Sequence, residues 1–382
     1  MPVDRMLPTP EAAELVGLIA EIAREQLAPR ASEAEAAARF PREEFRVLGR
    51  AGLFGMPYPE RWGGLDQPYE VYLQALEEVA IAWMGVGVGV SVHVMTCLAL
   101  VRHGTDDQRG RFLPDMLGGE LLGAYALSEP QAGSDVAAMT TRAKRSDSGY
   151  ELHGQKAWIS HAGQADYYLT FARTSGDRNH GVSCFLVPAG IPGLAIGEPE
   201  RKMGLTASST ASVYFDGAPL PDDRMIGVEG EGLKIALGAL DSGRLGIAAG
   251  ATGLAQAALD VASSYANQRV QFGRTIAEFE GLQFLLADMA AAVDNARAAY
   301  LMAARKRDAG KPFSRDAAVA KLTATDAAMK VSTDAVQVLG GYGYTREFPV
   351  ERYMREAKAT QIFEGTNQIQ RLVIARELLK HA

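Results

Sequence analysis

The chain has 382 residues, of which 47% are hydrophobic and 22% charged, which is enough to bury a large core in two or three domains. Its formal net charge is −7, and Lys and Arg form no continuous stripe, which argues against a nucleic-acid partner. Its only cysteines are Cys97 and Cys184, and two cysteines cannot form a disulfide framework for so long a chain. The sequence has no cluster of Cys and His that would predict a metal site. We expect a globular protein of the reducing cytoplasm that binds no metal.

The N-terminal third, residues 1–121, has the pattern of a helical domain. Four apolar residues recur at the spacing of one helix face: Leu15, Leu18, Ile19 and Ile22. Pro29 is expected to fall near the end of that helix, and the Pro- and Gly-rich stretch 57–68 is expected to be a loop. The acidic, Pro-containing N-terminus lacks the basic start and apolar run of a signal peptide.

Residues 79–101 form a run of 23 residues without Asp, Glu, Lys or Arg, which is long enough to span a bilayer. The run also holds three glycines, Ser91, His93 and Thr96, and it lacks an aromatic belt at both ends. A buried helix is therefore favoured over a membrane span. The "GVGVGV" within this run does not have the GxGxxG spacing of a dinucleotide site, so its glycines predict close helix packing.

Between residues 122 and 228 the composition shifts to β-branched and aromatic residues, with Gly, Asp, Asn and Pro between the runs. The segments 167–174, 182–188 and 211–221 are predicted strands. No long helical pattern separates them, so we expect an antiparallel β domain, as a barrel or a sandwich.

Residues 229–382 are Ala-rich and are predicted to form a bundle of four long helices. One helix is expected to stop at Gly340–Gly341. Another has an apolar face made of Leu282, Leu285, Leu286, Met289 and Val293. The predicted fold is therefore mainly α with a central β domain.

Two stretches of the middle segment carry polar residues in a setting that suits ligand binding. "YALSEPQAGSD" (125–135) is a turn whose backbone N–H groups and whose Ser128 and Ser134 hydroxyls can hold an anion or a heteroaromatic ring, with a solvated interdomain loop as the alternative. "QKAWISHAG" (155–163) places Trp158 and Ser160 at alternate positions of a strand, although Trp158 also suits a core position.

Two further stretches lie among the C-terminal helices. "ANQRVQFGRTIAEFEGLQF" (266–284) places Arg269, Phe272 and Arg274 around a glycine between two helices, where an arginine pair can bind phosphate or cap the preceding helix. "IFEGTNQIQ" (362–370) sets the carboxylate of Glu364 between an aromatic residue and a glycine. A charge at the edge of such an apolar segment calls for a functional reason.

Five stretches follow one another along the chain: "YALSEPQAGSD", "KAWISHAG", "RVQFGRTI", "DAVQVLGGYGYTREFPVERYMREAK" and "IFEGTNQIQRLVIAREL". In this order and spacing, with "PERWGG" before them, they resemble the acyl-CoA dehydrogenase family over essentially the whole chain. The resemblance implies an N-terminal helical domain, a middle β domain and a C-terminal four-helix bundle, with FAD between the last two.

The resemblance also implies which residues contact FAD. The turn 125–134 would lie along the flavin ring and the pyrophosphate, and Trp158 to Ser160 would flank the ring, with Ser160 near its N5 edge. Arg269 and the segment 337–341 would reach the FAD of a neighbouring subunit, which implies at least a dimer and commonly a tetramer. The implied cofactor-binding residues are Tyr125, Ala126, Leu127, Ser128, Gly133, Ser134, Trp158, Ile159, Ser160, Arg269, Phe272, Gln337, Val338, Leu339, Gly340, Gly341, Thr366, Asn367 and Gln368.

Glu364 matches the catalytic base of the family. The implied reaction is the FAD-dependent α,β-desaturation of an acyl-CoA to the trans-2-enoyl-CoA, in which Glu364 removes the α-proton, flavin N5 accepts the β-hydride, and electrons pass to electron-transfer flavoprotein. Hydrogen bonds from the Glu364 N–H and FAD would stabilise the enolate, and burial would raise the pKa of the carboxylate. The implied substrate contacts are Ser134, Asp241, Arg244, Phe363 and Gly365.

Some branches of the family carry the base on the helix that reads "LDSGRLG" here, where Gly243 offers no carboxylate, so Glu364 is favoured. "LDSGRLGIAAGATGLAQAALD" and "MGLTASST" most resemble the short-chain, butyryl-type branch. A bulky Met95 in the helix at 92–98 would shorten the acyl pocket. An acyl-CoA oxidase, a flavin monooxygenase or a non-catalytic relative on the same fold are the alternatives.

Two positions depart from the common family pattern. His161 stands in "HAG", where the family often has Thr-Asn-Gly; we expect a loop histidine at the domain edge, with a second acid/base group as the alternative. Glu280 stands where a glutamine that contacts flavin is common. A carboxylate near FAD phosphates is unfavourable, so Glu280 is expected to point away or to lose the contact.

Overall fold

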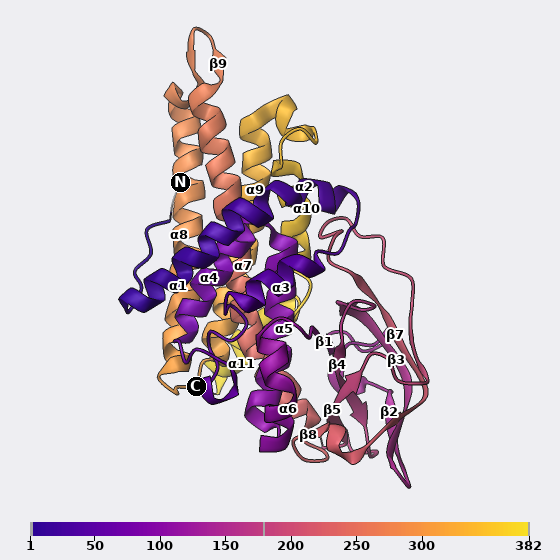
Figure 1. The fold of residues 1–382 in the computed structure, drawn as a ribbon. Coiled ribbons are helices and arrows are strands. Elements are labelled where there is room, and N and C mark those ends of the chain that lie inside the picture. Colours follow the sequence, from indigo (N-terminus) through magenta and orange to yellow (C-terminus); the bar gives the residue numbers. More distant parts are fainter. Residues whose placement is uncertain (1–2, 179, 381–382) are drawn as a thin grey trace.

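The computed structural model describes residues 3–178 and 180–380, and the chain runs through helices, then a sheet, then helices (Figure 1). Long helices lie together, and the sheet lies to one side of them (Figure 1). This order confirms the predicted fold class. The N-terminal helices are α1 (Pro10–Ile22), α2 (Ala28–Ala36), α3 (Arg42–Arg50), α4 (Tyr69–Ala82), α5 (Met84–His103) and α6 (Asp106–Leu117).

Pro29 does not end the first helix, contrary to the prediction. A π-helical segment, Ala23–Leu27, links α1 to α2, and Pro29 falls in the first turn of α2. Proline is tolerated there because an N–H in the first turn has no partner within its own helix. The predicted apolar face is also wrong at Leu18, which is 45% exposed, whereas Ile19 and Ile22 are buried.

The glycine-rich run forms α5, which lies in the core. α5 and the later helix α7 (Gly232–Gln268) are long and apolar enough to cross a membrane, but 94% and 89% of their most apolar windows are buried inside the protein. The prediction of a buried helix is therefore confirmed. A Cβ at Gly87 would stand 3.0 Å from the Cβ of Ala80, and one at Gly89 would stand 2.4 Å from the Phe45 ring, so these glycines permit close packing.

The middle segment forms one mixed sheet of eight strands rather than a purely antiparallel one. β1 pairs with β4 in parallel and β2 meets β4 in a parallel bridge, whereas the other pairs are antiparallel. The long connection from β1 to β4 contains the β2–β3 hairpin, so the chain returns in the same direction without a crossover helix. The strands are β1 (Gly123–Ala126), β2 (Arg142–Ser146), β3 (Gly149–Ser160), β4 (Tyr167–Arg173), β5 (Val182–Pro188), β6 (Leu194–Ile196), β7 (Thr210–Leu220) and β8 (Met225–Ile226).

Residues 229–380 form three long helices and two shorter ones, rather than four long ones. They are α7, α8 (Glu280–Asp308), α9 (Ser314–Leu339), α10 (Val350–Thr360) and α11 (Asn367–Leu379). α9 ends at Leu339, and Gly340 follows with φ +59°, so the predicted stop at the glycine pair is confirmed. A hairpin of β9 (Val270–Gln271) and β10 (Arg274–Thr275) joins α7 to α8 and projects at the top of Figure 1.

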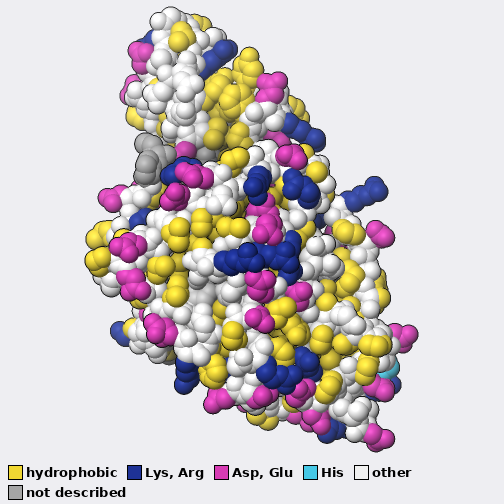
Figure 2. All heavy atoms as spheres, viewed as in Figure 1, with side chains coloured by type: hydrophobic (Ala, Val, Ile, Leu, Met, Phe, Trp, Pro, Cys, Tyr) yellow, Lys and Arg dark blue, Asp and Glu magenta, His cyan; other side chains and the backbone are white. Residues whose placement is uncertain are grey.

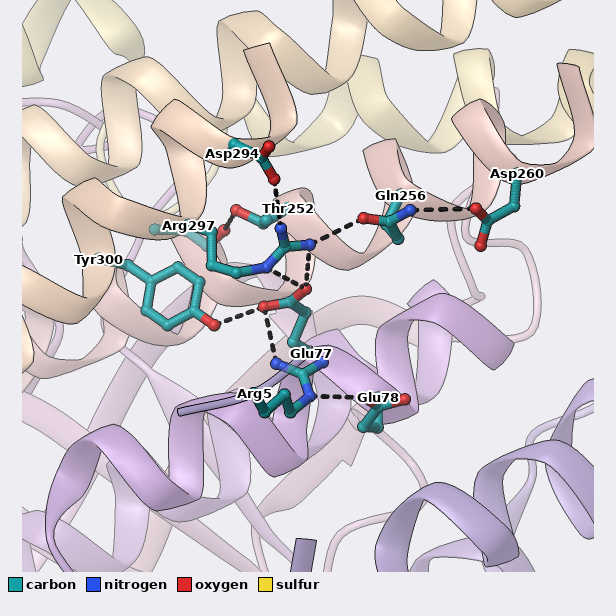
Figure 3. Close-up of polar contacts among 10 residues, drawn as sticks. Arg5, Glu77, Glu78, Thr252, Gln256, Asp260, Asp294, Arg297 and Tyr300 are labelled. Carbon is teal, nitrogen blue, oxygen red and sulfur yellow. Dashed lines mark hydrogen bonds and ion pairs between the residues drawn. The ribbon is translucent and has the colours of Figure 1, made fainter. Parts of the chain in front are cut away.

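A buried ionic cluster fixes α4 to the C-terminal helices (Figure 3). Glu77 of α4 is fully buried; its carboxylate accepts hydrogen bonds from Arg297 at 2.8 Å, from Arg5 at 3.3 Å and from the Tyr300 hydroxyl. Burial alone would raise the pKa of Glu77, but Arg5 and Arg297 outweigh it and hold that pKa below its usual value. The cluster locks the position of α4, which packs beside α5 and α7.

Candidate active site

Glu364 lies in a tight turn between α10 and α11. The backbone of Glu364 has φ +51° and that of Gly365 has φ +84°, so two successive residues adopt the left-handed conformation. Glycine tolerates this region and glutamate does so only at a cost, which marks Glu364 as a residue held in place by its surroundings. Thr366 then caps α11 by accepting a hydrogen bond from the Ile369 N–H at 3.2 Å.

The Glu364 side chain points inward, between α7 and α5. A Cβ placed on Gly243 would stand 2.2 Å from Glu364 Oε2 and 2.7 Å from the sulfur of Met95. Both carboxylate oxygens are buried, and neither has a hydrogen-bond partner within residues 3–178 and 180–380. Phe363 is half-buried and packs against the main core. The carboxylate is thus buried, and the described residues offer it no hydrogen-bond partner.

Burial dominates the electrostatics of this carboxylate. It raises the pKa of Glu364 to about 7, although the nearby cations Lys321 and Arg244 act in the opposite direction. Burial likewise lowers the pKa of Lys321 to about 7, against the attraction of Glu364. Glu364 can therefore exchange a proton near neutral pH, as a general base must.

The two predicted substrate contacts on α7 form an ion pair. Asp241 Oδ1 accepts a hydrogen bond from Arg244 at 2.6 Å, and its other oxygen accepts one from the Ser314 hydroxyl. Arg244 is 6% exposed, and its Nε is buried without a partner in the described chain. Gln370 Oε1 is likewise buried without a hydrogen-bond partner in the described chain. Buried polar atoms that lack a partner in the protein commonly form hydrogen bonds to a ligand or to water, so the surroundings of Glu364 suit a polar ligand.

The predicted turn 125–134 divides into a buried and an open part. The side chains of Tyr125, Ala126 and Leu127 are buried, and the Tyr125 hydroxyl donates to the carbonyl of Ala236 at 3.0 Å. Their side chains belong to the core, and the contacts of these three residues with FAD stay a prediction. Ser128 is half-buried, and Gly133 and Ser134 are exposed, so this end of the turn is open to a ligand.

A buried ion pair that sequence reasoning missed supports this turn. Lys156 of β3 donates to Glu129 Oε1 at 2.8 Å and to the carbonyl of Leu127 at 3.0 Å. Glu129 also accepts from the N–H groups of Thr140 and Thr141 at 2.6 and 3.0 Å. Burial would raise the pKa of Glu129, but these partners lower it to about 2. The motif itself holds the signal, since Glu129 follows the apolar stretch 125–127 by two positions, and a buried carboxylate needs a partner.

The segment Trp158 to Ser160 lies at an irregular end of β3. The pairing with β7 shifts register between Lys156 and Ile159, and Trp158 has φ +62°. This bulge turns the Trp158 ring outward, where it is 62% exposed, while Ile159 is buried and Ser160 is half-buried. Trp158 therefore does not occupy a core position, and it offers an aromatic face beside a hydroxyl.

The two departures have different outcomes. His161 is fully buried, contacts the rings of Phe40 and Phe45, and shares a hydrogen bond with the carbonyl of Gly123 at 3.0 Å. Burial lowers its pKa to about 4, so it is a neutral core histidine rather than a loop residue at the domain edge. Glu280 is exposed at the start of α8, on the helix that follows the hairpin.

The residues after Gly365 support the turn more than they face a ligand. Asn367 is 4% exposed, and its amide bonds to Lys321, Thr325 and Asp326 at 2.9, 2.9 and 2.8 Å. Asn367 therefore supports the turn, and its contact with FAD stays a prediction. Gln368 is exposed at the start of α11.

A second group of predicted residues lies at the far end of α7. Arg269 and residues 338–341 line one groove, together with Tyr265 and Tyr342. Arg269 follows Gly243 by 26 positions of this helix, which corresponds to about 39 Å. Figure 2 shows hydrophobic side chains beside this end of the molecule; Phe272, at the tip of the hairpin, is 94% exposed. Gln337 is exposed nearby. The structure thus separates this group from Glu364 within one chain.

The described part of the chain contains no group of three or more His, Cys, Asp and Glu side chains that could hold a metal ion. Its buried ionisable groups include the Lys156–Glu129 pair, the cluster around Glu77 and the carboxylate of Glu364, which has no partner in the described residues. The buried carboxylate of Glu364, with its raised pKa, suits proton transfer to or from a ligand beside it.

Three family descriptions match consecutive parts of the chain. The N-terminal domain of acyl-CoA dehydrogenase matches residues 9–120, the middle domain matches residues 124–218, and the C-terminal domain matches residues 230–379. The matches follow the change from helices to sheet and back to helices.

Individual relatives agree with this assignment along their whole length. A short-chain specific acyl-CoA dehydrogenase of Clostridium acetobutylicum is 41% identical over 367 residues, which cover 95% of this chain and 96% of the relative. The butyryl-CoA dehydrogenase structure from Megasphaera elsdenii has a TM-score of 0.95 at 40% identity and covers 99% of this chain and 100% of that one. A chain in a structure of the electron transferring flavoprotein of Acidaminococcus fermentans has a TM-score of 0.96 at 41% identity, with full coverage of both chains. The chain belongs to the FAD-dependent acyl-CoA dehydrogenase family.

Proposed function

We propose that this enzyme desaturates a short acyl-CoA to the trans-2-enoyl-CoA, with Glu364 as the base that removes the α-proton. The observation that carries the proposal is the Glu364 carboxylate, which is buried, lacks a partner in the described chain and lies against Gly243. A carboxylate held dry and unpaired has a strong drive to accept a proton, because the neutral form is the one that burial favours.

Two features of the chain favour removal of a weakly acidic proton. The raised pKa of Glu364, about 7, reduces the difference between the pKa of the base and the pKa of the α-proton of the thioester. The Glu364 N–H is the donor that we propose for the thioester carbonyl, where it would stabilise the charge that develops on oxygen. Arg244 and Lys321 add positive potential beside the same place. The turn therefore supplies both the base and part of the stabilisation.

The residues on the sheet side fit FAD. The exposed ring of Trp158 offers an aromatic face, and the half-buried Ser160 on the same strand offers a hydroxyl donor. The open end of the turn, at Ser128 and Ser134, offers further hydroxyl donors. When bound, FAD supplies the acceptor that takes the β-hydrogen with its electron pair. Trp158 and Ser160 would hold the ring, and Lys156 and Glu129 would hold the turn beneath it.

We further propose that the groove at Arg269 serves the FAD of a neighbouring subunit. The groove lies about 39 Å along α7 from Gly243, which is too far for one flavin to contact both places. The site is therefore complete only in an oligomer of at least two chains, and we propose a homotetramer.

The acyl pocket is expected to be short. Met95 is 4% exposed, and its sulfur lies beside the Gly243 Cα, so it fills space next to the base on the α5 side. The similarity to short-chain and butyryl-CoA dehydrogenases agrees with a short straight or branched acyl group.

We also propose electron-transfer flavoprotein as the electron acceptor, in keeping with the similarity to a chain in a structure of such a flavoprotein. A cytoplasmic location suits the two buried free cysteines, Cys97 and Cys184. We propose domain boundaries at 121/122 and 228/229, where helices give way to strands and strands to helices.

Anaerobic reduction of the bound flavin by butyryl-CoA tests the proposal. We expect the flavin absorbance to bleach with the wild type, and Glu364→Gln to keep FAD and CoA binding but to lose the bleaching rate by orders of magnitude. A Glu364→Gln enzyme with near-normal reduction would mean that another residue is the base. Hydrogen peroxide release that matches substrate turnover would indicate an oxidase instead.

A further inference from the structure

Lys321, in the N-terminal third of α9, is fully buried although its flexible side chain ends in an ammonium group. Its ammonium donates to the carbonyl of Gly365 at 2.9 Å and to Asn367 Oδ1 at 2.9 Å. A buried ammonium needs acceptors, and here both come from the segment that carries Glu364. These two hydrogen bonds tie α9 directly to the turn.

Gln370 holds the same turn from the other side. Its amide donates to the carbonyl of Gly365 at 2.8 Å and to that of Glu364 at 3.2 Å, and the side chain is fully buried. The carbonyls of both left-handed residues are therefore fixed by side chains. A strained backbone of this kind persists only where several contacts determine it together.

Lys321 also acts on Glu364 through its charge. It opposes the effect of burial on the carboxylate more strongly than Arg244 does. The other ionisable groups that interact with Glu364 or Lys321 come from three further elements and from α9 itself. They are Tyr69 and Tyr72 on α4, Tyr125 on β1, Arg244 on α7 and Asp326 on α9.

We propose that Lys321 is a positioning residue for proton abstraction. With Gln370, its ammonium holds the left-handed turn that directs the Glu364 carboxylate at Gly243, and its positive charge favours the ionised form of that carboxylate. This inference rests on the proposed function, in which Glu364 is the base. Lys321 itself does not touch the substrate in this account.

The variants Lys321→Met, Lys321→Arg and Gln370→Met separate position from charge. In anaerobic stopped-flow reduction with butyryl-CoA, Lys321→Met should reduce the rate at least tenfold and move the acidic limb of its pH profile to higher pH. Lys321→Arg keeps the charge, so its acidic limb should stay near that of the wild type. Gln370→Met loosens the same carbonyls without altering a charge, so it should slow reduction with an unmoved limb.

Lys330→Met is the matched control, because Lys330 is exposed on the same helix and pairs only with Asp334 among the contacts described, at 2.6 Å. It should keep the wild-type rate and pH profile. FAD content and thermal midpoint are measured for every variant, so that loss of fold is not read as loss of rate.

A Lys321→Met enzyme with the wild-type rate and acidic limb would overturn the proposal. The proposal would also be overturned if Lys321→Met had a lower rate that lost FAD or lost fold explained entirely, while the acidic limb of its pH profile stayed where it is in the wild type. That result would mean that Lys321 has a structural role alone. If Lys321→Met does not fold, Gln370→Met decides: reduction at the wild-type rate overturns the proposal. Glu364→Gln separates the two claims, because an active Glu364→Gln enzyme refutes the base itself, whereas an inactive one leaves only Lys321 in question.

Discussion

Replacing Gly243 by alanine should displace the carboxylate of Glu364, the proposed base, without harming the fold. The added Cβ would stand 2.2 Å from Glu364 Oε2 and 2.7 Å from the sulfur of Met95. Carbon and oxygen atoms that are not bonded need more than about 3 Å, so the carboxylate has to retreat by about 1 Å. A misplacement of about 1 Å costs roughly 100-fold in rate for a reaction that depends on near-attack geometry.

The fold should tolerate this change. Both atoms that the Cβ meets are near the ends of flexible side chains, and Gly to Ala inside a helix is favourable by about 1 kcal/mol. We therefore expect a thermal midpoint equal to or above that of the wild type, together with flavin reduction by butyryl-CoA that is about 100-fold slower.

Gly238→Ala is the matched control, because Gly238 lies on the same helix and its Cβ would meet nothing within 4 Å. It should reduce flavin at the wild-type rate. A Gly243→Ala enzyme as fast as this control would refute the placement of Glu364 against Gly243. A loss of stability in Gly243→Ala alone would refute the claim that only the two side chains move.

Four further outcomes are expected. The reduction rate should rise with pH towards a plateau above about 7, because Glu364 must be ionised; a flat profile from pH 5 to 9 would contradict this. Folding raises the pKa of Glu364, so the folded state binds more protons than the unfolded state between pH 4.5 and about 7. The stability of the wild type should therefore fall as the pH rises through that window, relative to Glu364→Gln. Thermal melts at several pH values check this. Met95→Ala should raise kcat/KM for hexanoyl-CoA relative to butyryl-CoA about tenfold, and an unchanged ratio would place the end of the pocket elsewhere. Lys156→Met would leave the Glu129 carboxylate buried without its ion-pair partner, which should lower the free energy of unfolding by about 3–5 kcal/mol and cause loss of FAD. Chemical denaturation measures the first effect and the flavin-to-protein ratio the second. An enzyme with unaltered stability and FAD content would contradict the claim that this pair supports the turn.

Local patterns were sufficient for much of the fold. Apolar periodicity placed the helical segments, and the glycine pair at 340–341 ended α9 as expected. Pro29 misled because helix continuity depends on the π-helical segment before it, which no local pattern indicates. The parallel pairing of β1 was missed because strand direction depends on where a long connection returns.

The sequence by itself determined the family, the order of the segments and the identity of the candidate base, because these depend on residue types at fixed spacing. Only the tertiary structure decided that Glu364 points at Gly243, that Asn367 and Tyr125 are committed to the interior, and that Arg269 lies far from the base. The physical reason is that burial and pairing are set by residues distant in the chain. A carboxylate gains a raised pKa from the helices that enclose it, and those helices come from all parts of the sequence.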